Sequence, residues 1–170
     1  MGLAEDFTAA AAAVLPDWAV IALIAMLPFI ELRGALPVAV LLFGWDVWAA
    51  LGWCVAFNIV PGVVVVYGMD RLEPRLRKVG ALDRAMDWVF ERTRRRHADR
   101  GGRASSVRWR ALLLALFVGV PLPVTGAWSG AAIAYVFGMD KRYAAVGITA
   151  GVVIAGVIIA LLIVLFSIYV

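Results

Sequence analysis

The sequence predicts an all-α integral membrane protein, and three observations lead to this fold class. Hydrophobic residues make up 64% of the 170 positions and charged residues 16%, whereas soluble domains are about half apolar and about a quarter charged. The hydrophobic residues are concentrated in four apolar runs, at 18–45, 47–69, 111–139 and 143–170. Of the 16 Lys and Arg residues, 13 lie between the second run and the third. A soluble globular domain is therefore excluded.

The first apolar run, 18–45, is interrupted near its centre. The interrupting residues are Pro28, Glu31, Arg33, Gly34 and Pro37. A continuous helix of this run would be about 42 Å long at about 1.5 Å per residue, well beyond the roughly 30 Å hydrocarbon core of a bilayer. Proline also ends or kinks a helix. We therefore expect a re-entrant helical hairpin whose two arms meet near the bilayer midplane.

The second run, 47–69, is long enough to span the bilayer, since about 20 helical residues cross its core. Asn58 and the pair Pro61-Gly62 interrupt its apolar pattern. Two interpretations of Asn58 stay open: its amide binds a hairpin tip, or it packs against another helix. Cys54 is the single cysteine of the chain, so we expect it to be a packing residue and expect no intrachain disulfide.

The segment 70–110 carries most of the positive charge, with 13 basic and 6 acidic residues. The positive-inside rule places it in the cytoplasm. Apolar residues recur within it at helical spacing, which predicts an amphipathic helix along the inner leaflet. These residues are Leu82, Ala85, Met86, Val89 and Phe90. No nucleic-acid recognition motif accompanies the arginines, so we expect membrane lipid and no nucleic acid as the partner of this segment.

The third run, 111–139, is broken in the same way as the first. The interrupting residues are Pro121, Pro123, Thr125 and Gly126. We expect a second re-entrant hairpin here, and Thr125 has the chemistry of an N-cap for the helix after the break. Trp128 and Ser129 follow, and the indole either walls a cavity or packs against the protein. The fourth run, 143–170, is expected to be a second spanning helix.

The two halves of the chain, 18–69 and 111–170, share a short repeat. Phe43-Gly44-Trp45-Asp46 precedes the first spanning segment, and Phe137-Gly138-Met139-Asp140 precedes the second. Each half is predicted to consist of a hairpin, an acidic turn and a spanning helix. The cytoplasmic connection would then make the two halves inverted relative to one another.

This inverted repeat makes a prediction of topology. It puts Lys141, Arg142 and the basic segment on the cytoplasmic side and both termini on the outer side, so that the charge pattern obeys the positive-inside rule. A plain four-span bundle with the same cytoplasmic segment would put Lys141 and Arg142 outside and the C-terminus inside.

Glu31 and Arg33 are the strongest candidates for a functional site. An ionisable residue at the bilayer centre costs about 3 kcal/mol on insertion scales and is usually functional. Helix N-termini bind anions; we expect such ends near Gly34 and after Thr125, which with Arg33 would suit a carboxylate or a phosphate. Carbonyls of the entering arms would also offer partners to cations and protons. The alternative is a structural salt bridge between Glu31 and Arg33 that locks the tip.

Other kinds of chemistry have little support in the sequence. No nucleotide-binding loop, Ser/His/Asp set or pair of catalytic carboxylates is present, so we expect neither enzyme activity nor a cofactor. His97 has no second ligand near it, so we expect no metal site. Glycines at small-xxx-small spacing predict close helix contacts. They are Gly126 with Gly130, and Gly147 with Gly151 and Gly156.

Two motifs carry a resemblance to a known family. They are Pro28-Phe-Ile-Glu-Leu-Arg-Gly-Ala-Leu-Pro37 and Pro121-Leu-Pro-Val-Thr-Gly-Ala-Trp128. From about residue 25 onwards the chain resembles the small multidrug export protein family of prokaryotic membrane proteins. This family looks distantly related to the DedA (VTT-domain) superfamily, which is similar in having two facing re-entrant hairpins in an inverted repeat. The resemblance implies a multi-pass protein of the prokaryotic plasma membrane.

The resemblance also implies a kind of activity. The superfamily is associated with proton-dependent transport and with moving lipids, including polyprenyl-phosphate carriers, across the bilayer. DedA proteins typically have basic residues in the second hairpin, whereas residues 118–134 contain none. The positions that match the motifs are Glu31, Arg33, Pro37, Pro121, Pro123, Thr125 and Gly126.

Our leading hypothesis is a proton-coupled transporter of an anionic or amphiphilic lipid, with its site between the hairpin tips. Glu31 would carry the proton, and Arg33 with the helix N-termini would hold the headgroup. The full set of candidate residues is Glu31, Arg33, Pro37, Asn58, Pro121, Pro123, Thr125, Gly126, Trp128 and Ser129. The alternatives are a homodimeric four-span antiporter that exchanges protons for cationic drugs, and a membrane scaffold that transports nothing.

Overall fold

The computed structural model describes residues 15–76, 107–122 and 125–169, and within these ranges every regular element is helical. The elements are α2 (Asp17–Met26), α3 (Glu31–Pro37), the π-helical turn η1 (Val38–Leu42), α4 (Val47–Leu76), α6 (Val107–Gly119), α7 (Ala127–Val136) and α8 (Lys141–Tyr169). The predicted all-α class is therefore confirmed. The amphipathic helix expected around residues 82–90 lies outside the described ranges.

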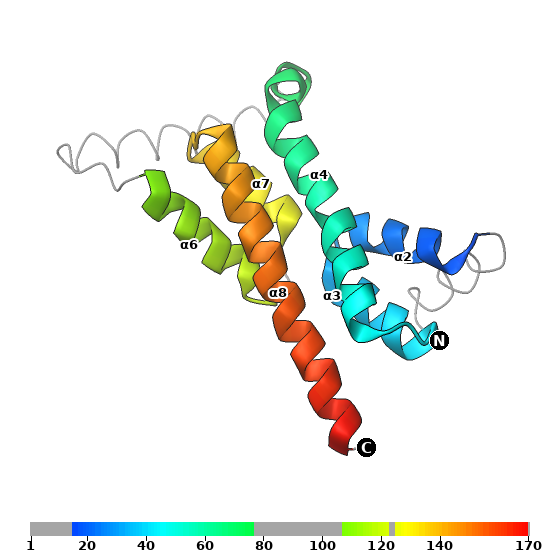
Figure 1. The fold of residues 1–170 in the computed structure, drawn as a ribbon. Coiled ribbons are helices and arrows are strands. Elements are labelled where there is room, and N and C mark those ends of the chain that lie inside the picture. The colour runs from blue at the N-terminus through cyan, green and yellow to red at the C-terminus, as the bar shows by residue number, and fades with distance from the viewer. Residues whose placement is uncertain (1–14, 77–106, 123–124, 170) are drawn as a thin grey trace.

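Helices α4 and α8 are the two long helices, and they pack against one another while running in opposite directions (Figure 1). Their segments Val47–Arg71 and Lys141–Ser167 have mean hydropathies of 2.1 and 3.0 and are long enough to cross a bilayer. Large hydrophobic side chains remain exposed on them, including Val64, Val146 and Phe166. Water would disfavour so much exposed apolar surface, whereas lipid solvates it. The structure is thus that of a helical membrane protein.

The first apolar run folds as two short helices, α2 and α3, which we call the first broken pair. Leu27 after α2 is extended, with φ −69° and ψ 137°, as expected for a residue that precedes proline. The chain returns to helix at Glu31, whose N–H donates to the Leu27 carbonyl at 3.0 Å. The predicted break is present, and its re-entrant placement in the bilayer stays a prediction.

Two details of the first broken pair differ from expectation. The second helix begins at Glu31 and not near Gly34, because the bond from Glu31 to Leu27 completes the turn within four residues. Pro37 does not end the helix either. It lacks an N–H, but α3 continues directly into η1, and the wider π-helical turn carries the chain past it.

The third apolar run likewise folds as two helices, α6 and α7, which we call the second broken pair. The break between them spans residues 120–126 and contains Pro121, as predicted. Helix α6 already begins at Val107, and α4 continues to Leu76. Both ends of the basic segment 70–110 are therefore helical.

The short repeat forms the same turn at two places in the fold. Gly44 and Gly138 have φ values of 68° and 56°, in the left-handed region that glycine adopts without strain. Two residues later, Asp46 Oδ2 accepts from the N–H groups of Trp48 and Ala49, and Asp140 Oδ1 accepts from the N–H of Arg142. Each motif thus turns the chain and caps the long helix that follows.

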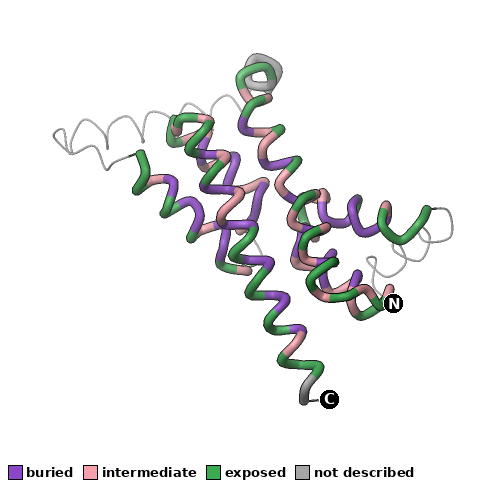
Figure 2. The backbone as a smooth tube through the Cα atoms, in the orientation of Figure 1, coloured by how far each residue is buried: buried purple, intermediate pink, exposed green. Residues whose placement is uncertain are grey.

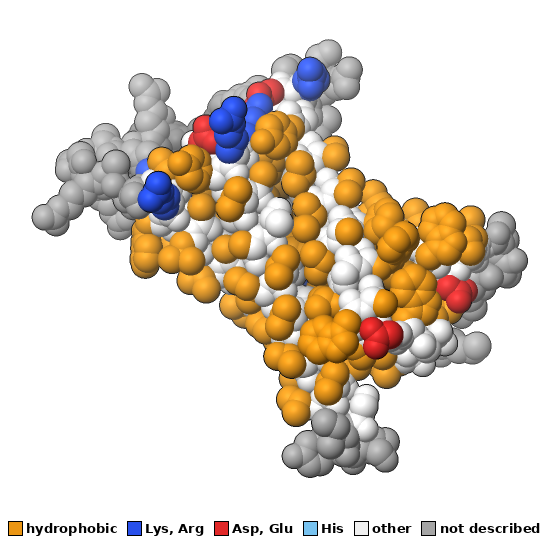
Figure 3. Space-filling model, viewed as in Figure 1, with side chains coloured by type: hydrophobic (Ala, Val, Ile, Leu, Met, Phe, Trp, Pro, Cys, Tyr) orange, Lys and Arg blue, Asp and Glu red, His pale blue; other side chains and the backbone are white. Residues whose placement is uncertain are grey.

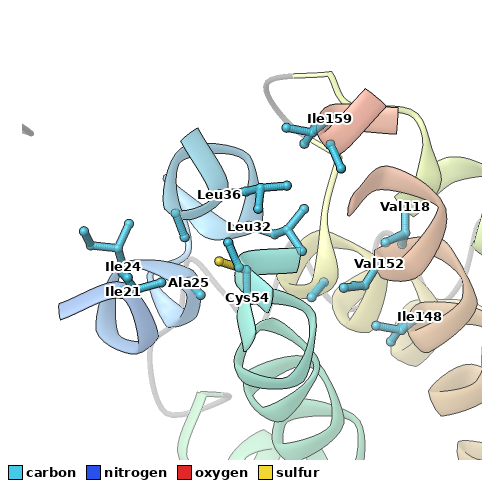
Figure 4. Close-up of a cluster of buried hydrophobic side chains, with 14 of the residues drawn as sticks. Ile21, Ile24, Ala25, Leu32, Leu36, Cys54, Val118, Ile148, Val152 and Ile159 are labelled. Carbon is cyan, nitrogen blue, oxygen red and sulfur yellow. The ribbon is translucent and has the colours of Figure 1, made fainter. Parts of the chain in front are cut away.

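The buried residues lie where the broken pairs face the long helices (Figure 2). Leu32 and Leu36 of α3 gather near Cys54 of α4, and Val118 of α6 lies beside Val152 of α8 (Figure 4). Cys54 is fully buried, which supports the packing role expected for it.

Glycines allow α6 to approach α8 closely. A Cβ atom at Gly147 would lie 2.8 Å from the Ala111 carbonyl oxygen, and one at Gly151 would lie 2.8 Å from the Ala115 carbonyl oxygen. Both distances are shorter than van der Waals contact allows. The predicted small-residue contact between helices is therefore present, and it joins the second broken pair to the long helix that follows it.

Apart from Glu31 and Arg33, the charged side chains of the described residues lie near the ends of the helices. In Figure 3 the visible Lys and Arg side chains gather in the upper part of the view, and hydrophobic side chains cover most of the surface below them. An ion pair between Lys141, at the start of α8, and Asp70, near the end of α4, lies at the charged end. The beginning of α8 and the beginning of the basic segment therefore share one end of the fold.

Candidate functional site

The two breaks meet in the interior, and Glu31 is the residue that crosses from one to the other. Its side chain is buried, with the residue only 7% exposed. The carboxylate lies at the N-terminal end of α7, where the N–H of Trp128 faces Oε1 at 3.5 Å and the N–H of Ala127 also contacts it. A separation of 3.5 Å is long for a hydrogen bond, and the positive end of the helix dipole adds to the attraction.

Gly126 makes this approach possible. A Cβ atom at this position would lie 1.9 Å from Glu31 Oε2 and 2.5 Å from Oε1. No side chain fits into that space, so glycine is required by the contact rather than by its own backbone, whose φ of 177° is extended. The match of Gly126 to the family motif thus has a steric explanation in this structure.

Glu31 also has an unusual backbone conformation. Its φ of 52° is the one positive value at a non-glycine position among the described residues. A left-handed conformation at such a residue costs on the order of 1–3 kcal/mol. It is held in place because the residue both closes the turn after α2 and places its carboxylate on α7. Strain of this kind clusters at functional sites.

Arg33 makes the second contact between the broken pairs. Its Nη2 donates to Thr125 Oγ1 at 2.9 Å. Thr125 Oγ1 in turn donates to the Val120 carbonyl at 2.6 Å and accepts from the N–H of Leu122 at 3.2 Å. Glu31 and Arg33 therefore each bind the second broken pair, whereas the alternative of a structural salt bridge concerned only the contact of these two residues with one another.

The expected role of Thr125 as an N-cap is wrong. Helix α7 begins at Ala127, and Gly126 occupies the N-cap position. The N–H of Gly126 donates to Ser129 Oγ at 2.9 Å. The hydroxyl of Thr125 is instead taken up by backbone groups of the break, which have no helical partners of their own. Ser129 thus caps α7, a function that we did not predict for it.

Trp128 forms a third connection. Its Nε1 donates at 3.2 Å to the carbonyl of Met26, the last residue of α2. Carbonyls at a helix C-terminus lack partners within the helix, so the indole satisfies one of them. Of the two interpretations of Trp128, packing between the broken pairs therefore has direct support.

Asn58 lies beside these contacts on α4. It is 3% exposed, and its Oδ1 has no hydrogen-bond partner within the described structure. It lines a small pocket together with Glu31 and Arg33, with a free volume of about 10 Å³. The remaining lining residues are Leu32, Val118, Gly126, Ala127, Val152 and Ala155. The structure thus places Asn58 beside both breaks without a hydrogen bond from its Oδ1 to either, and both of its interpretations stay open.

The other candidate residues lie at the edge of this arrangement. Pro37 lies in the last turn of α3, half-buried, and Pro121 lies half-buried in the second break. Pro123 lies outside the described residues. No group of three or more His, Cys, Asp and Glu side chains that could hold a metal occurs within the ranges that the structure describes.

Sequence reasoning missed several contributors to the site. The N–H of Ala127 and the carbonyl of Met26 are backbone groups, so no side-chain type could have marked them. Val118, Val152 and Ala155 line the pocket but are identical in type to other apolar residues of their helices. The one usable signal was Ser129, three residues after Gly126, which is the spacing of a capping interaction.

Comparison with known proteins adds one match. The profile of a family described as small multi-drug export protein matches residues 31–158, which is more than half of the chain. The match begins at Glu31, directly after the first break, and includes the second break, all of α4 and α8 as far as Ile158. No curated protein and no solved structure matches the chain.

Proposed function

The chain belongs to the small multi-drug export protein family, and from this premise we propose that it is a proton-coupled transporter of an anionic amphiphile. The observation that carries the proposal is the position of the Glu31 carboxylate on the N-terminal end of α7. The family name indicates transport as the class of function. The proton, the substrate class and the route are our proposal.

The proposed coupling follows from competition for one anion site. The N-terminal end of α7 attracts negative charge, and ionised Glu31 occupies it. Protonation removes the charge of Glu31 and therefore its attraction to α7. The N–H groups of Ala127 and Trp128 are then free for a phosphate or carboxylate headgroup, and Arg33 provides positive charge nearby. Binding of a proton by Glu31 and binding of an anion at α7 would thus favour one another.

The pocket must widen before it holds a substrate, and a headgroup requires less widening than a whole drug molecule. Its free space is about 10 Å³, which is room for about one water molecule, whereas drug-sized ligands occupy pockets of about 300–1,000 Å³. An amphiphile would place only its headgroup there and keep its chain in lipid, against the exposed apolar faces of the helices. A polyprenyl phosphate has this chemistry.

The test is translocation by purified protein in proteoliposomes. The probe is a fluorescently labelled polyprenyl phosphate, and its movement between leaflets is followed by dithionite quenching at several pH values. We expect E31Q to lose pH-dependent movement of the probe. The matched control is D17N, another acid-to-amide change at an exposed position, and it should behave as wild type. Full pH-dependent movement by E31Q would overturn the proposal.

A second arm tests the competing functions. Ethidium is loaded into the same proteoliposomes and a proton gradient is applied. Ethidium export without movement of the polyprenyl phosphate would favour the drug/proton antiporter. A wild-type protein that moves neither probe, and cells that tolerate simultaneous E31Q and R33Q replacement, would favour the scaffold.

A further inference from the structure

Asn58 presents a buried acceptor that nothing satisfies. The residue is 3% exposed, and Oδ1 is without a partner among the described groups. Buried polar side-chain atoms nearly always have a hydrogen-bond partner, so an exception calls for an explanation. In the interior of a membrane protein water is scarce, which makes an unpaired oxygen more costly than at a wet surface.

The groups that face Asn58 across the pocket are few. Among the residues that the structure describes, only Glu31 and Arg33, both from α3, bring charged side chains to the lining. Helices α6, α7 and α8 contribute the apolar side chains of Val118, Ala127, Val152 and Ala155. Arg33 already donates to Thr125. A donor for Oδ1 must therefore come from Glu31, from Arg33 or from a water molecule in the pocket.

The protonation state of Glu31 decides between its partners. An ionised carboxylate only accepts hydrogen bonds, whereas a neutral carboxyl group has one O–H donor. The N–H groups of α7 are therefore matched to the ionised form. The oxygen of Asn58 is matched to the neutral form. The two partners lie on different elements, α7 and α4, around the same pocket.

We propose that Asn58 is the second hydrogen-bond partner of Glu31. After it is protonated, the Glu31 side chain leaves the N-terminus of α7 and donates its O–H to Asn58 Oδ1. The proton comes from the aqueous phase, and the carboxylate that takes it up gives up its two contacts to α7. Glu31 then has two positions, one for each protonation state. Asn58 is a positioning residue in this switch, and the inference rests on the proposed function because it explains how α7 is vacated for an anion.

The direct test is infrared spectroscopy of the detergent-solubilised protein during a pH titration. The C=O stretch of a neutral carboxyl group reports its hydrogen bonding, and comparison with E31Q identifies the band of Glu31. In N58L, which keeps the size of the side chain but removes the amide, we expect the band to move to higher frequency. The pH midpoint at which this band appears should shift to lower pH by about one unit, which is a tenfold loss in the proton affinity of Glu31.

Two further variants keep the test decisive. N58D is nearly isosteric but adds a like charge, so the midpoint should shift to higher pH; this variant also serves if N58L does not fold. C54A alters a fully buried neighbour on α4 that does not line the pocket, and it should leave the band unchanged. An unchanged frequency and midpoint in folded N58L or N58D would overturn the inference.

The remaining outcomes are also informative. If N58L weakens the binding of inorganic phosphate but leaves the Glu31 band unchanged, Asn58 serves Arg33 or the anion, and the inference is wrong. The band can respond to Asn58 even if no polyprenyl phosphate is transported. Failure of the proposed substrate and failure of the switch are therefore distinguishable.

Discussion

Arg33 and Thr125 stand 92 positions apart in the sequence, yet Arg33 Nη2 donates to Thr125 Oγ1 across 2.9 Å. The same hydroxyl donates to the Val120 carbonyl at 2.6 Å. Thr125 therefore orders the second break internally and connects it to the first. A charged donor strengthens such a bond, and a partly buried setting limits competition from water.

We expect T125V to destabilise the protein, because it removes the acceptor of Arg33 and the donor to Val120 while keeping the shape of the side chain. The loss should be about 1–3 kcal/mol in the free energy of unfolding, measured by denaturant titration in detergent. T125S retains the hydroxyl and is the matched control. Equal stability of T125V and T125S would contradict this assignment.

G126A tests the approach of Glu31 to α7. The added Cβ would lie 1.9 Å from Glu31 Oε2, so the carboxylate must leave its position. Overpacking of this kind costs about 1–3 kcal/mol. If this cost is added to the activation free energy of transport, the initial rate of polyprenyl-phosphate movement falls roughly tenfold or more.

The control for G126A is G52A on α4, where nothing lies within 4 Å of the new Cβ atom. Alanine is the better helix former, so this variant should be at least as stable as wild type and transport at the same rate. If G126A and G52A behave alike in transport, the contact between Glu31 and α7 does not matter for function.

G151A tests the packing of α6 on α8. Its Cβ would meet Val118 Cβ at 2.5 Å and the Ala115 carbonyl oxygen at 2.8 Å. Neither partner is the flexible end of a long side chain, so the helices must separate. We expect a loss of about 1–3 kcal/mol in unfolding free energy, whereas G68A, which also meets nothing within 4 Å, should cost nothing.

Local rules predicted much of this fold from sequence. Pro28 and Pro121 mark the two breaks because the missing N–H and the restricted preceding residue act within a few positions. Gly44 with Asp46, and Gly138 with Asp140, mark the two capped turns because glycine adopts a positive φ and the aspartate accepts from N–H groups of the next helical turn. In each case the cause and the effect lie next to one another in the chain.

The exact arrangement at the tips could not be predicted in this way. We predicted Thr125 as the N-cap of α7, but Gly126 occupies this position. The Thr125 hydroxyl binds Arg33, which is distant in sequence, and the backbone of the break. Glu31 was identified from its charge in an apolar run, but its partners are backbone N–H groups that every residue possesses. The left-handed conformation of Glu31 likewise depends on contacts made only in the folded chain.

The contact between Lys141 and Asp70 supports one topology and can be tested by cysteine labelling. Both residues lie at the same end of the fold, as the hairpin topology requires, whereas the four-span alternative puts them on opposite sides of the membrane. We expect a membrane-impermeant maleimide to label A49C, but not R142C, in intact cells; both positions are exposed. In inside-out vesicles the pattern should reverse.

The native Cys54 provides the control for this experiment. Its side chain is fully buried, so the parent protein should remain unlabelled from either side, and the variants are best made with C54A in the background. The positive-inside rule predicts that the basic segment is cytoplasmic, and the ion pair with Asp70 would put Lys141, and with it Arg142, on the same side. Labelling of R142C in intact cells would therefore contradict the hairpin topology and favour four spans.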